Sequence, residues 1–284
     1  LAHLCASEPD WQGLLNRLNI VILPYENPDG ADLHARLSAS MDAATWKHHP
    51  ARYNATGFEF SEDFFNTATL FGESRARPAL YRRWPADVIV DNHGVPSHEW
   101  IQPFAGFGSP PRFRVSYWIP QALIYGIVRY VDDERYPEHE RAATALRDAV
   151  SEAFAETDIA KWNSVYGKSY RFWGQDRDPE HFPGEFHSGM LWHISQSPVE
   201  PEGRGMNVRW PRTTVLSWVT EVNDETAQGA HLERVARAHL LANRAMLDLM
   251  AAASPALRQT VSFSTDSTTF RFGRSRPLEL GKSG

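Results

Sequence analysis

The sequence lacks the features that define several protein classes. Cys5 is the only cysteine, so an intrachain disulfide and a zinc site built on cysteines are both excluded. No stretch approaches the roughly 20 consecutive apolar residues that a membrane-spanning helix needs. The net charge is −6 and arginine and lysine form no long run, which argues against nucleic-acid binding. We therefore predict neither a membrane nor a nucleic acid as a partner.

Apolar and aromatic residues, in contrast, are plentiful. Of the 284 residues, 42% are hydrophobic, and they include ten tryptophans and fifteen phenylalanines. This composition supports a large core that needs no disulfide for stability. The chain has no internal repeat, no low-complexity stretch and no convincing linker. We therefore expect one domain over residues 1–284.

Local periodicity predicts alternating helices and strands. Helices are expected over residues 9–18, 31–47, 73–84, 119–130, 137–156 and 229–252, and we expect the arginines of 73–84 on the exposed face of that helix. Strands are expected over residues 19–24, 88–91 and 213–219, with a hairpin or edge strand over 260–272. We expect residues 27–30 to form the turn that closes the first of these strands. Residues 157–212 are rich in Trp, Gly, Pro and His, and we expect them to be the least regular part. The strand–turn–helix–strand order implies crossover connections and a parallel or mixed sheet.

The most informative segment is residues 86–94, which read as a buried strand that stops on Asp91, Asn92 and His93. In α/β folds, strand ends are where a sheet presents chemical groups to ligands. Asp91 and His93 are two residues apart, so a strand directs both side chains to the same face. A carboxylate beside an imidazole fixes its tautomer and raises its basicity, which suits a metal ligand. Taken alone, this pattern more often marks a structural histidine at a strand end.

Five short segments stand in a fixed order along the chain: Asn27-Pro28-Asp29-Gly30, Gly72-Glu73-Ser74-Arg75-Ala76, Asp91-Asn92-His93, Gln102-Pro103-Phe104-Ala105-Gly106-Phe107 and Trp218-Val219-Thr220-Glu221. The ordered set resembles the zinc carboxypeptidases, the M14-type metallopeptidases, over roughly residues 10–235. Asn-Pro-Asp-Gly alone is only moderately specific, and the set is much more so. The resemblance implies an α/β fold with a mixed, mostly parallel sheet and helices on both faces.

The resemblance also implies a zinc-dependent hydrolase that cleaves peptide or amide bonds. His93 would be the third protein ligand of the zinc ion. The neighbouring carboxylate of Asp91 would fix the tautomer and the orientation of the His93 ring. Zinc would activate a water molecule and polarise the carbonyl group, with Glu221 as the general base. Glu221 ends an apolar, β-prone run, as His93 does, so we expect both at the same edge of the sheet.

The oxyanion formed in such a reaction needs a cation or a hydrogen-bond donor. The family uses an arginine located after the Asn-Pro-Asp-Gly segment, and two residues of this chain are candidates, Arg52 and Lys47. We prefer Arg52 because a guanidinium binds bidentately and stays charged.

The substrate pocket departs from the family. Carboxypeptidases hold the C-terminal carboxylate of the substrate with an Asn-Arg pair, whereas residues 56–60 carry Glu59 and neither member of that pair. A glutamate there would repel a carboxylate and attract an amine. An amidase that acts on a modified or amino-linked substrate is therefore an alternative. We expect His98 at the rim of the pocket, and His193 in the region where the family has a tyrosine that closes over the substrate.

The first two zinc ligands of the family lie in an H-x-x-E segment ahead of Asn-Pro-Asp-Gly. None of the twelve histidines begins such a segment. The expected helix 9–18 and strand 19–24 resemble the two elements that come directly after that segment in the family, so we expect it to precede Leu1. Without an H-x-x-E segment, His93 would be the single imidazole ligand and could not hold zinc tightly. A non-catalytic binding protein or a fragment is therefore the second alternative.

Overall fold

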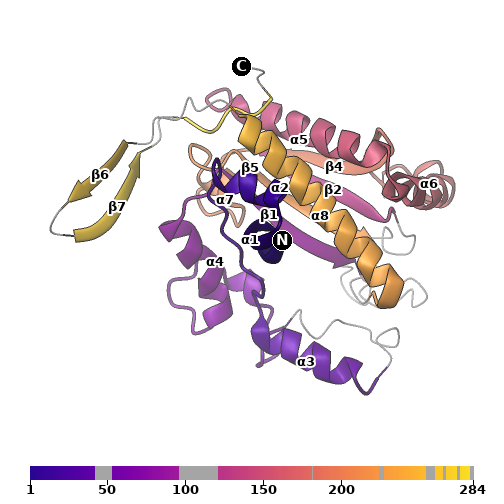
Figure 1. The fold of residues 1–284 in the computed structure, drawn as a ribbon, viewed down its shortest axis with the longest axis horizontal. Coiled ribbons are helices and arrows are strands. Elements are labelled where there is room, and N and C mark those ends of the chain that lie inside the picture. The colour runs from indigo at the N-terminus through magenta and orange to yellow at the C-terminus, as the bar shows by residue number, and fades with distance from the viewer. Residues whose placement is uncertain are drawn as a thin grey trace.

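A five-stranded sheet with the order β1-β5-β2-β4-β3 forms the centre of an α/β fold (Figure 1). The computed structural model describes residues 1–41, 53–95, 121–180, 182–223, 227–253, 260–264, 267–273 and 276–281. The strands of the sheet are β1 (Val88–Val95), β2 (Ile124–Val131), β3 (Glu185–His187), β4 (Met190–Ser197) and β5 (Leu216–Asn223). A separate hairpin consists of β6 (Thr260–Ser264) and β7 (Ser267–Gly273).

Eight α-helices lie in the described part of the chain. They are α1 (Ala2–Ser7), α2 (Pro9–Leu15), α3 (Pro28–Ser38), α4 (Gly72–Arg83), α5 (Glu138–Ala155), α6 (Asp158–Tyr170), α7 (Met206–Arg209) and α8 (Gly229–Ala252). A 3₁₀ turn η3 (Phe60–Asp63) precedes α4, and a π turn η6 (Arg171–Gln175) continues α6. None of the described helices combines the length and the apolar character that crossing a bilayer requires.

The sheet is mixed, as predicted, but it is only partly parallel rather than mostly parallel. β1–β5 and β2–β4 pair in parallel, whereas β2–β5 and β3–β4 pair antiparallel. The chain passes from β2 to its parallel neighbour β4 through α5 and α6, the kind of crossover that parallel strands require. Because β1 and β5 run in the same direction, their carboxyl ends lie at the same edge of the sheet.

The larger core lies between the sheet and the helices α5 and α8, which cover one face (Figure 1). Trp192 of β4 and Trp218 of β5 are fully buried there and stack with their ring centroids 6.2 Å apart. Trp192 donates to Ser151 Oγ of α5 at 2.9 Å, and Trp218 donates to the sulfur of Met246 of α8 at 3.1 Å. Buried donors need partners, so these contacts fix both helices against the sheet.

The opposite face carries a smaller core. Tyr125 of β2 and Leu191 of β4 pack there with Tyr170, at the end of α6, and with Phe182. Side chains alternate between the two faces of a strand. The same face of β1 and β5 therefore carries the polar side chains that the sequence singled out.

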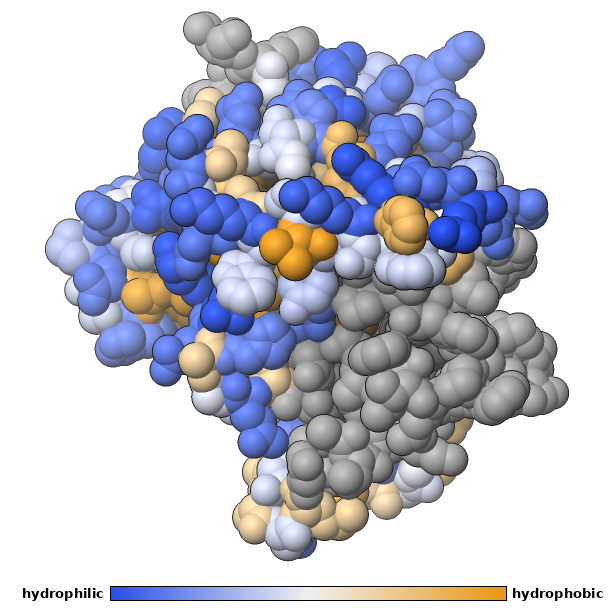
Figure 2. Space-filling view, turned by 90° about the vertical axis from the view of Figure 1, so that its right-hand side faces the viewer, coloured by the Kyte–Doolittle hydropathy of each residue, from blue (hydrophilic) through white to orange (hydrophobic). Residues whose placement is uncertain are grey.

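The α6 side of the molecule has exposed apolar side chains. Figure 2 looks at this side, where apolar side chains lie between strongly hydrophilic ones. Val165 is 58% exposed, and Phe172 and Trp173 of the π turn are 53% and 60% exposed. The Arg177 guanidinium lies over both of these rings, 5.1 and 5.3 Å from their centroids. This cation–π contact covers part of the apolar surface.

Long periodic patterns predicted their elements correctly. The helices α4, α5 and α8 and the hairpin β6–β7 form where they were expected. β1 contains the predicted strand 88–91 and continues to Val95. The run 213–219 forms β5, which starts at Leu216 and continues beyond Glu221, so that Glu221 lies within the strand rather than at its end.

The predicted helix over residues 119–130 is wrong, because Ile124–Val131 forms β2. β2 lies between β5 and β4 and is covered on both faces, so its apolar residues form a continuous run without the period of two. Residues 157–212, predicted as the least regular part of the chain, contain four regular elements, α6, α7, β3 and β4. Pro183, Gly184 and Gly189 lie in the short connections between these elements.

The strand predicted over residues 19–24 does not form. A strand needs a hydrogen-bonded neighbour, and among the described strands β1 pairs only with β5. The Asn-Pro-Asp-Gly segment, predicted as a turn that closes that strand, is instead the first turn of α3. Asn27 Oδ1 accepts a hydrogen bond from the Gly30 N–H at 3.0 Å, and Pro28 takes the first helical position.

The close contact between β2 and β4 yields a prediction for stability. A Cβ added at Gly126 would lie 2.3 Å from Cζ3 of the buried Trp192, so Gly126→Ala forces the tightly packed indole to move. We expect a loss of about 1–3 kcal/mol in the free energy of unfolding, measured by urea denaturation. Gly13→Ala in α2 is the control, because a Cβ there meets nothing within 4 Å. Equal stability of Gly126→Ala and the unsubstituted protein would contradict this packing of glycine against indole.

Candidate active site

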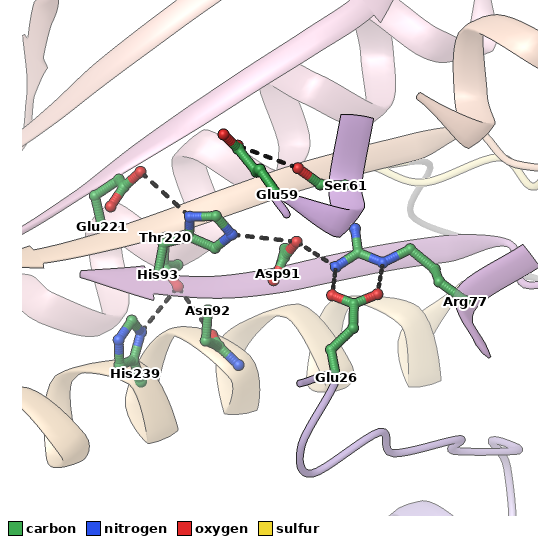
Figure 3. A network of polar contacts seen from close by, with 10 residues as sticks. All are labelled: Glu26, Glu59, Ser61, Arg77, Asp91, Asn92, His93, Thr220, Glu221 and His239. Atoms are coloured by element: carbon green, nitrogen blue, oxygen red, sulfur yellow. Dashed lines mark hydrogen bonds and ion pairs between the residues drawn. The ribbon is translucent and has the colours of Figure 1, made fainter. Parts of the chain in front are cut away.

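The pairing of β1 with β5 places two predicted site residues side by side. His93 and Glu221 are register partners in this parallel pair. Nδ1 of His93 lies 3.8 Å from Oε1 of Glu221 (Figure 3). The Glu221 side chain is 12% exposed, whereas that of His93 is 51% exposed. The imidazole is therefore open to a ligand, next to a carboxylate that is largely shielded from water.

Asp91 holds the other nitrogen of the same ring. Nε2 of His93 lies 3.3 Å from Oδ2 of Asp91, and its N–H donates to that carboxylate. In the neutral ring this contact keeps the proton on Nε2 and leaves the lone pair of Nδ1 on the side of Glu221. The structure thus brings Asp91, His93 and Glu221 together on one face of the sheet, and strand periodicity predicted the shared face of Asp91 and His93.

Arg77 of α4 anchors Asp91. Its Nη2 donates to Oδ2 of Asp91 at 2.7 Å, and its Nε and Nη2 donate to the two carboxylate oxygens of Glu26 at 2.7 and 2.6 Å (Figure 3). The sequence pattern had placed the arginines of α4 on its exposed face, which is wrong for Arg77, whose side chain is 28% exposed. A bidentate guanidinium–carboxylate pair fixes geometry as well as charge.

Electrostatics at this site favour a positive charge on the imidazole. Burial alone would lower the pKa of His93, but the hydrogen bond and charge of Asp91 and the charge of Glu221 raise it to about 9. Burial would raise the pKa of Asp91, yet the hydrogen bond from His93 and the charge of Arg77 hold it well below its usual range. The carboxylates around His93 therefore stabilise a cation at this position.

A polar layer, partly shielded from solvent, lies under the two strands on the side of α8. Asn92 Oδ1 accepts hydrogen bonds from Thr220 Oγ1 at 2.9 Å and from Asn243 Nδ2 at 3.3 Å. Nδ1 of His239 lies 2.8 Å from Thr220 Oγ1, and its N–H is the donor because the hydroxyl proton of Thr220 points to Asn92. Burial and the charge of His93 lower the pKa of His239 to about 4, which keeps its ring neutral at physiological pH.

Glu59 comes from the segment that leads into η3. It is half-buried, and Ser61 Oγ donates to its Oε1 at 3.3 Å. In Figure 3 it is drawn with the Asp91–His93–Glu221 group, on the same side of β1 as the His93 ring. Three other predicted site residues, Arg52, Lys47 and His98, lie outside the described residues.

His193 lies on the same sheet face as Glu221, two strands away. Tyr125 of β2 is the register partner of Glu221, and its ring lies edge-on to His193 with centroids 5.3 Å apart. Nε2 of His193 lies 2.7 Å from Oε1 of Gln121, and burial lowers the pKa of His193 to about 4. Tyr125 and His193 thus extend the polar surface of the site across β2 to β4.

The metal-binding potential of the described residues is incomplete. In the parts of the chain that the structure describes, no three His, Cys, Asp or Glu side chains group closely enough to hold a metal ion. Comparisons with protein-family models, curated proteins and solved structures find no match for this chain. The chemical interpretation of the site therefore depends on its geometry and on the sequence segments that form it.

The sequence did not point to Glu26, Arg77, His239 or Asn243 as parts of the site. His239 and Asn243 are four residues apart, on the face of α8 that also carries the buried apolar side chains. Polar residues at this spacing on an apolar face are a signal that periodicity could have found. Glu26 and Arg77 carry no such signal, because their contact depends on where residues 19–26 pass α4.

The surroundings of His193 yield a prediction for pH dependence. Its pKa is about 4 in the folded protein and about 6.5 in the unfolded chain, so between these values the unfolded state binds more protons. The contribution of His193 to stability is therefore lost as the pH falls from 6.5 to 4, by about 2 kcal/mol after allowance for partial exposure. His193→Gln should lose less stability than the unsubstituted protein over this range, measured by urea denaturation at each pH. Parallel curves for the two proteins would refute the assignment of a buried, neutral His193.

Proposed function

We propose that this protein is a zinc-dependent hydrolase of the carboxypeptidase type that cleaves peptide or amide bonds. One observation carries the proposal: the Nε2–H of His93 is held by Asp91, and its Nδ1 faces the carboxylate of Glu221. A metal-binding imidazole needs this kind of carboxylate partner, and a hydrolase needs a base beside the metal. The ordered sequence segments that resemble the zinc carboxypeptidases support the same conclusion.

The donor set fits one position of a zinc site. His93 offers Nδ1, whereas Asp91 is held by Arg77 and Glu221 serves as the base, so two further ligands have to come from other residues. When bound, zinc supplies Lewis-acid chemistry, which polarises a carbonyl group and lowers the pKa of a water molecule. Glu221 takes a proton from the attacking water and returns it to the leaving amine. Asp91 keeps the His93 ring in one orientation throughout.

Two substitutions separate the proposed roles of metal ligand and base. Glu221→Gln should lower the turnover of peptide substrates about 10²–10⁴-fold while the zinc content is unchanged, because only proton transfer is lost. His93→Ala should lose zinc and activity together. The protein is expressed from its whole gene, and its zinc content is measured by mass spectrometry. Turnover is measured with a peptide library. His187→Ala is the control, because this exposed histidine pairs with Asp148 away from the site.

Full zinc occupancy in His93→Ala would show that His93 is not a ligand. If the unsubstituted protein has neither bound zinc nor turnover, a non-catalytic binding role is favoured instead. The first result rejects the assignment of the ligand, and the second rejects the proposed function.

Glu59 favours an amidase as the second candidate. The substrate-facing segment carries this carboxylate where the resemblance expects the pair of residues that binds a C-terminal carboxylate. An acidic group near the metal position disfavours a substrate carboxylate and favours an amine or a neutral amide.

Matched substrates distinguish the two activities. If the amidase alternative holds, C-terminally amidated peptides should be cleaved faster than the same peptides with a free carboxylate. Glu59→Gln should lower this ratio about tenfold, because removal of one negative charge relieves the repulsion. The ratio is obtained from kcat/KM for each pair of peptides. Glu62→Gln is the control, because Glu62 lies in the same segment and pairs with Arg204. Faster cleavage of the free acids by the unsubstituted protein would reject the amidase and leave the carboxypeptidase.

A further inference from the structure

Arg77 is the point where three segments of the chain meet. It projects from α4, donates two hydrogen bonds to Glu26 in the segment before α3, and donates one to Asp91 on β1. The guanidinium lies over the ring of Phe64, with Cζ of Arg77 5.1 Å from the centroid of that ring. The guanidinium is thus held by ion pairs and covered by an aromatic ring, an arrangement that fixes one conformation.

One branch from Arg77 leads to His93. A single oxygen, Oδ2 of Asp91, accepts from Nη2 of Arg77 at 2.7 Å and from Nε2 of His93 at 3.3 Å. The position of that oxygen sets the rotation of the imidazole ring, and Arg77 sets the position of the oxygen. Without Arg77, the Asp91 carboxylate could rotate about its side-chain bonds and release the ring.

The other branch leads to the segment that carries Glu59. Glu26 is followed by the buried Asn27, whose Nδ2 donates to the Tyr53 carbonyl at 2.7 Å. Asn54 Oδ1 then accepts from the backbone N–H of Phe58 at 3.0 Å, which closes the loop just before Glu59. Both sides of this segment thus connect to α4, because Ser74 Oγ of the same helix donates to the Phe60 carbonyl at 2.8 Å.

We propose that Arg77 is a positioning residue that holds His93 and the Glu59 segment in a fixed relation to each other. The inference deepens the proposed function and rests on it, since His93 is the assigned ligand and Glu59 the residue assigned to select the substrate. Arg77 touches neither metal nor substrate. It acts on one side through Asp91 and on the other through Glu26.

Two measurements on the metal-free protein test the two branches. The order of the His93 ring is measured by ¹³C relaxation of protein labelled at histidine Cε1, with His93→Gln used to assign the signal. The order of the Glu59 segment is measured by hydrogen exchange at the Phe58 amide, which donates to Asn54. Arg77→Met should increase ring motion and speed exchange at Phe58 about tenfold. Glu26→Gln should speed exchange at Phe58 and leave the His93 ring ordered.

Conservative and control variants separate positioning from general stability. Arg77→Lys keeps the charge but cannot form the bidentate pair, so it should restore ring order only in part. Arg82→Met is the matched control on the same helix, because Arg82 is exposed, and it should change neither readout. A His93 ring that stays ordered in Arg77→Met and Arg77→Lys, even if their melting temperatures fall, would overturn the proposal.

Zinc binding provides the readout that separates this inference from the proposed function. Zn²⁺ affinity, measured by competition with a chelator, should fall about 10–100-fold in Arg77→Met, the range expected when the partner of a metal ligand is lost. A protein that binds no Zn²⁺ but in which Arg77→Met frees the His93 ring would reject the proposed function and support the positioning role. Equal Zn²⁺ affinity in Arg77→Met and the unsubstituted protein would reject the positioning role and leave the function intact.

Discussion

The parallel register of β1 and β5 is the constraint on which the site depends. It makes His93 the partner of Glu221 and Asn92 the partner of Thr220. Because side chains alternate, one pair lies on the solvent-facing side of the sheet and the other lies over α8. A shift of one residue would turn His93 toward α8 and Asn92 toward the opposite face of the sheet. The layer of Asn92, Thr220 and His239 opposes such a shift, because the shift would break its partly buried hydrogen bonds.

The sequence predicted the parts of the site that depend on local periodicity. Asp91 and His93 share a face because they are two residues apart on a strand, and long amphipathic patterns identified α5 and α8. It failed for β2, where burial on both faces removes the alternation that separates a strand from a helix. It also failed for residues 19–24, because whether an extended segment becomes a strand depends on which neighbour it meets. Arg77 was misplaced for a similar reason, since a pattern on one helix does not reveal a carboxylate from another segment.

The resemblance to zinc carboxypeptidases and the geometry of the site are two independent observations. The resemblance rests on the order of five short segments along the chain. The geometry rests on two strands that are not consecutive in sequence and that nevertheless bring His93 beside Glu221. Nothing in the order of the segments requires the distance between the two side chains to be 3.8 Å. The Asn-Pro-Asp-Gly segment illustrates that sequence order and geometry are separate. It contributes to the resemblance, yet in the structure it starts α3 rather than closing a strand.

The charges of the site indicate what it is built to hold. Arg77 is shared between Glu26 and Asp91, and the carboxylate of Glu221 also lies beside the imidazole. The raised pKa of His93 reflects the hydrogen bond and charge of Asp91 and the charge of Glu221, which together favour a proton on the ring. A structural histidine at a strand end needs one acceptor, and a second carboxylate 3.8 Å from its other nitrogen adds negative charge without adding a hydrogen bond to the ring. In the proposed function, a divalent cation at Nδ1 would interact with the same carboxylates and displace that proton.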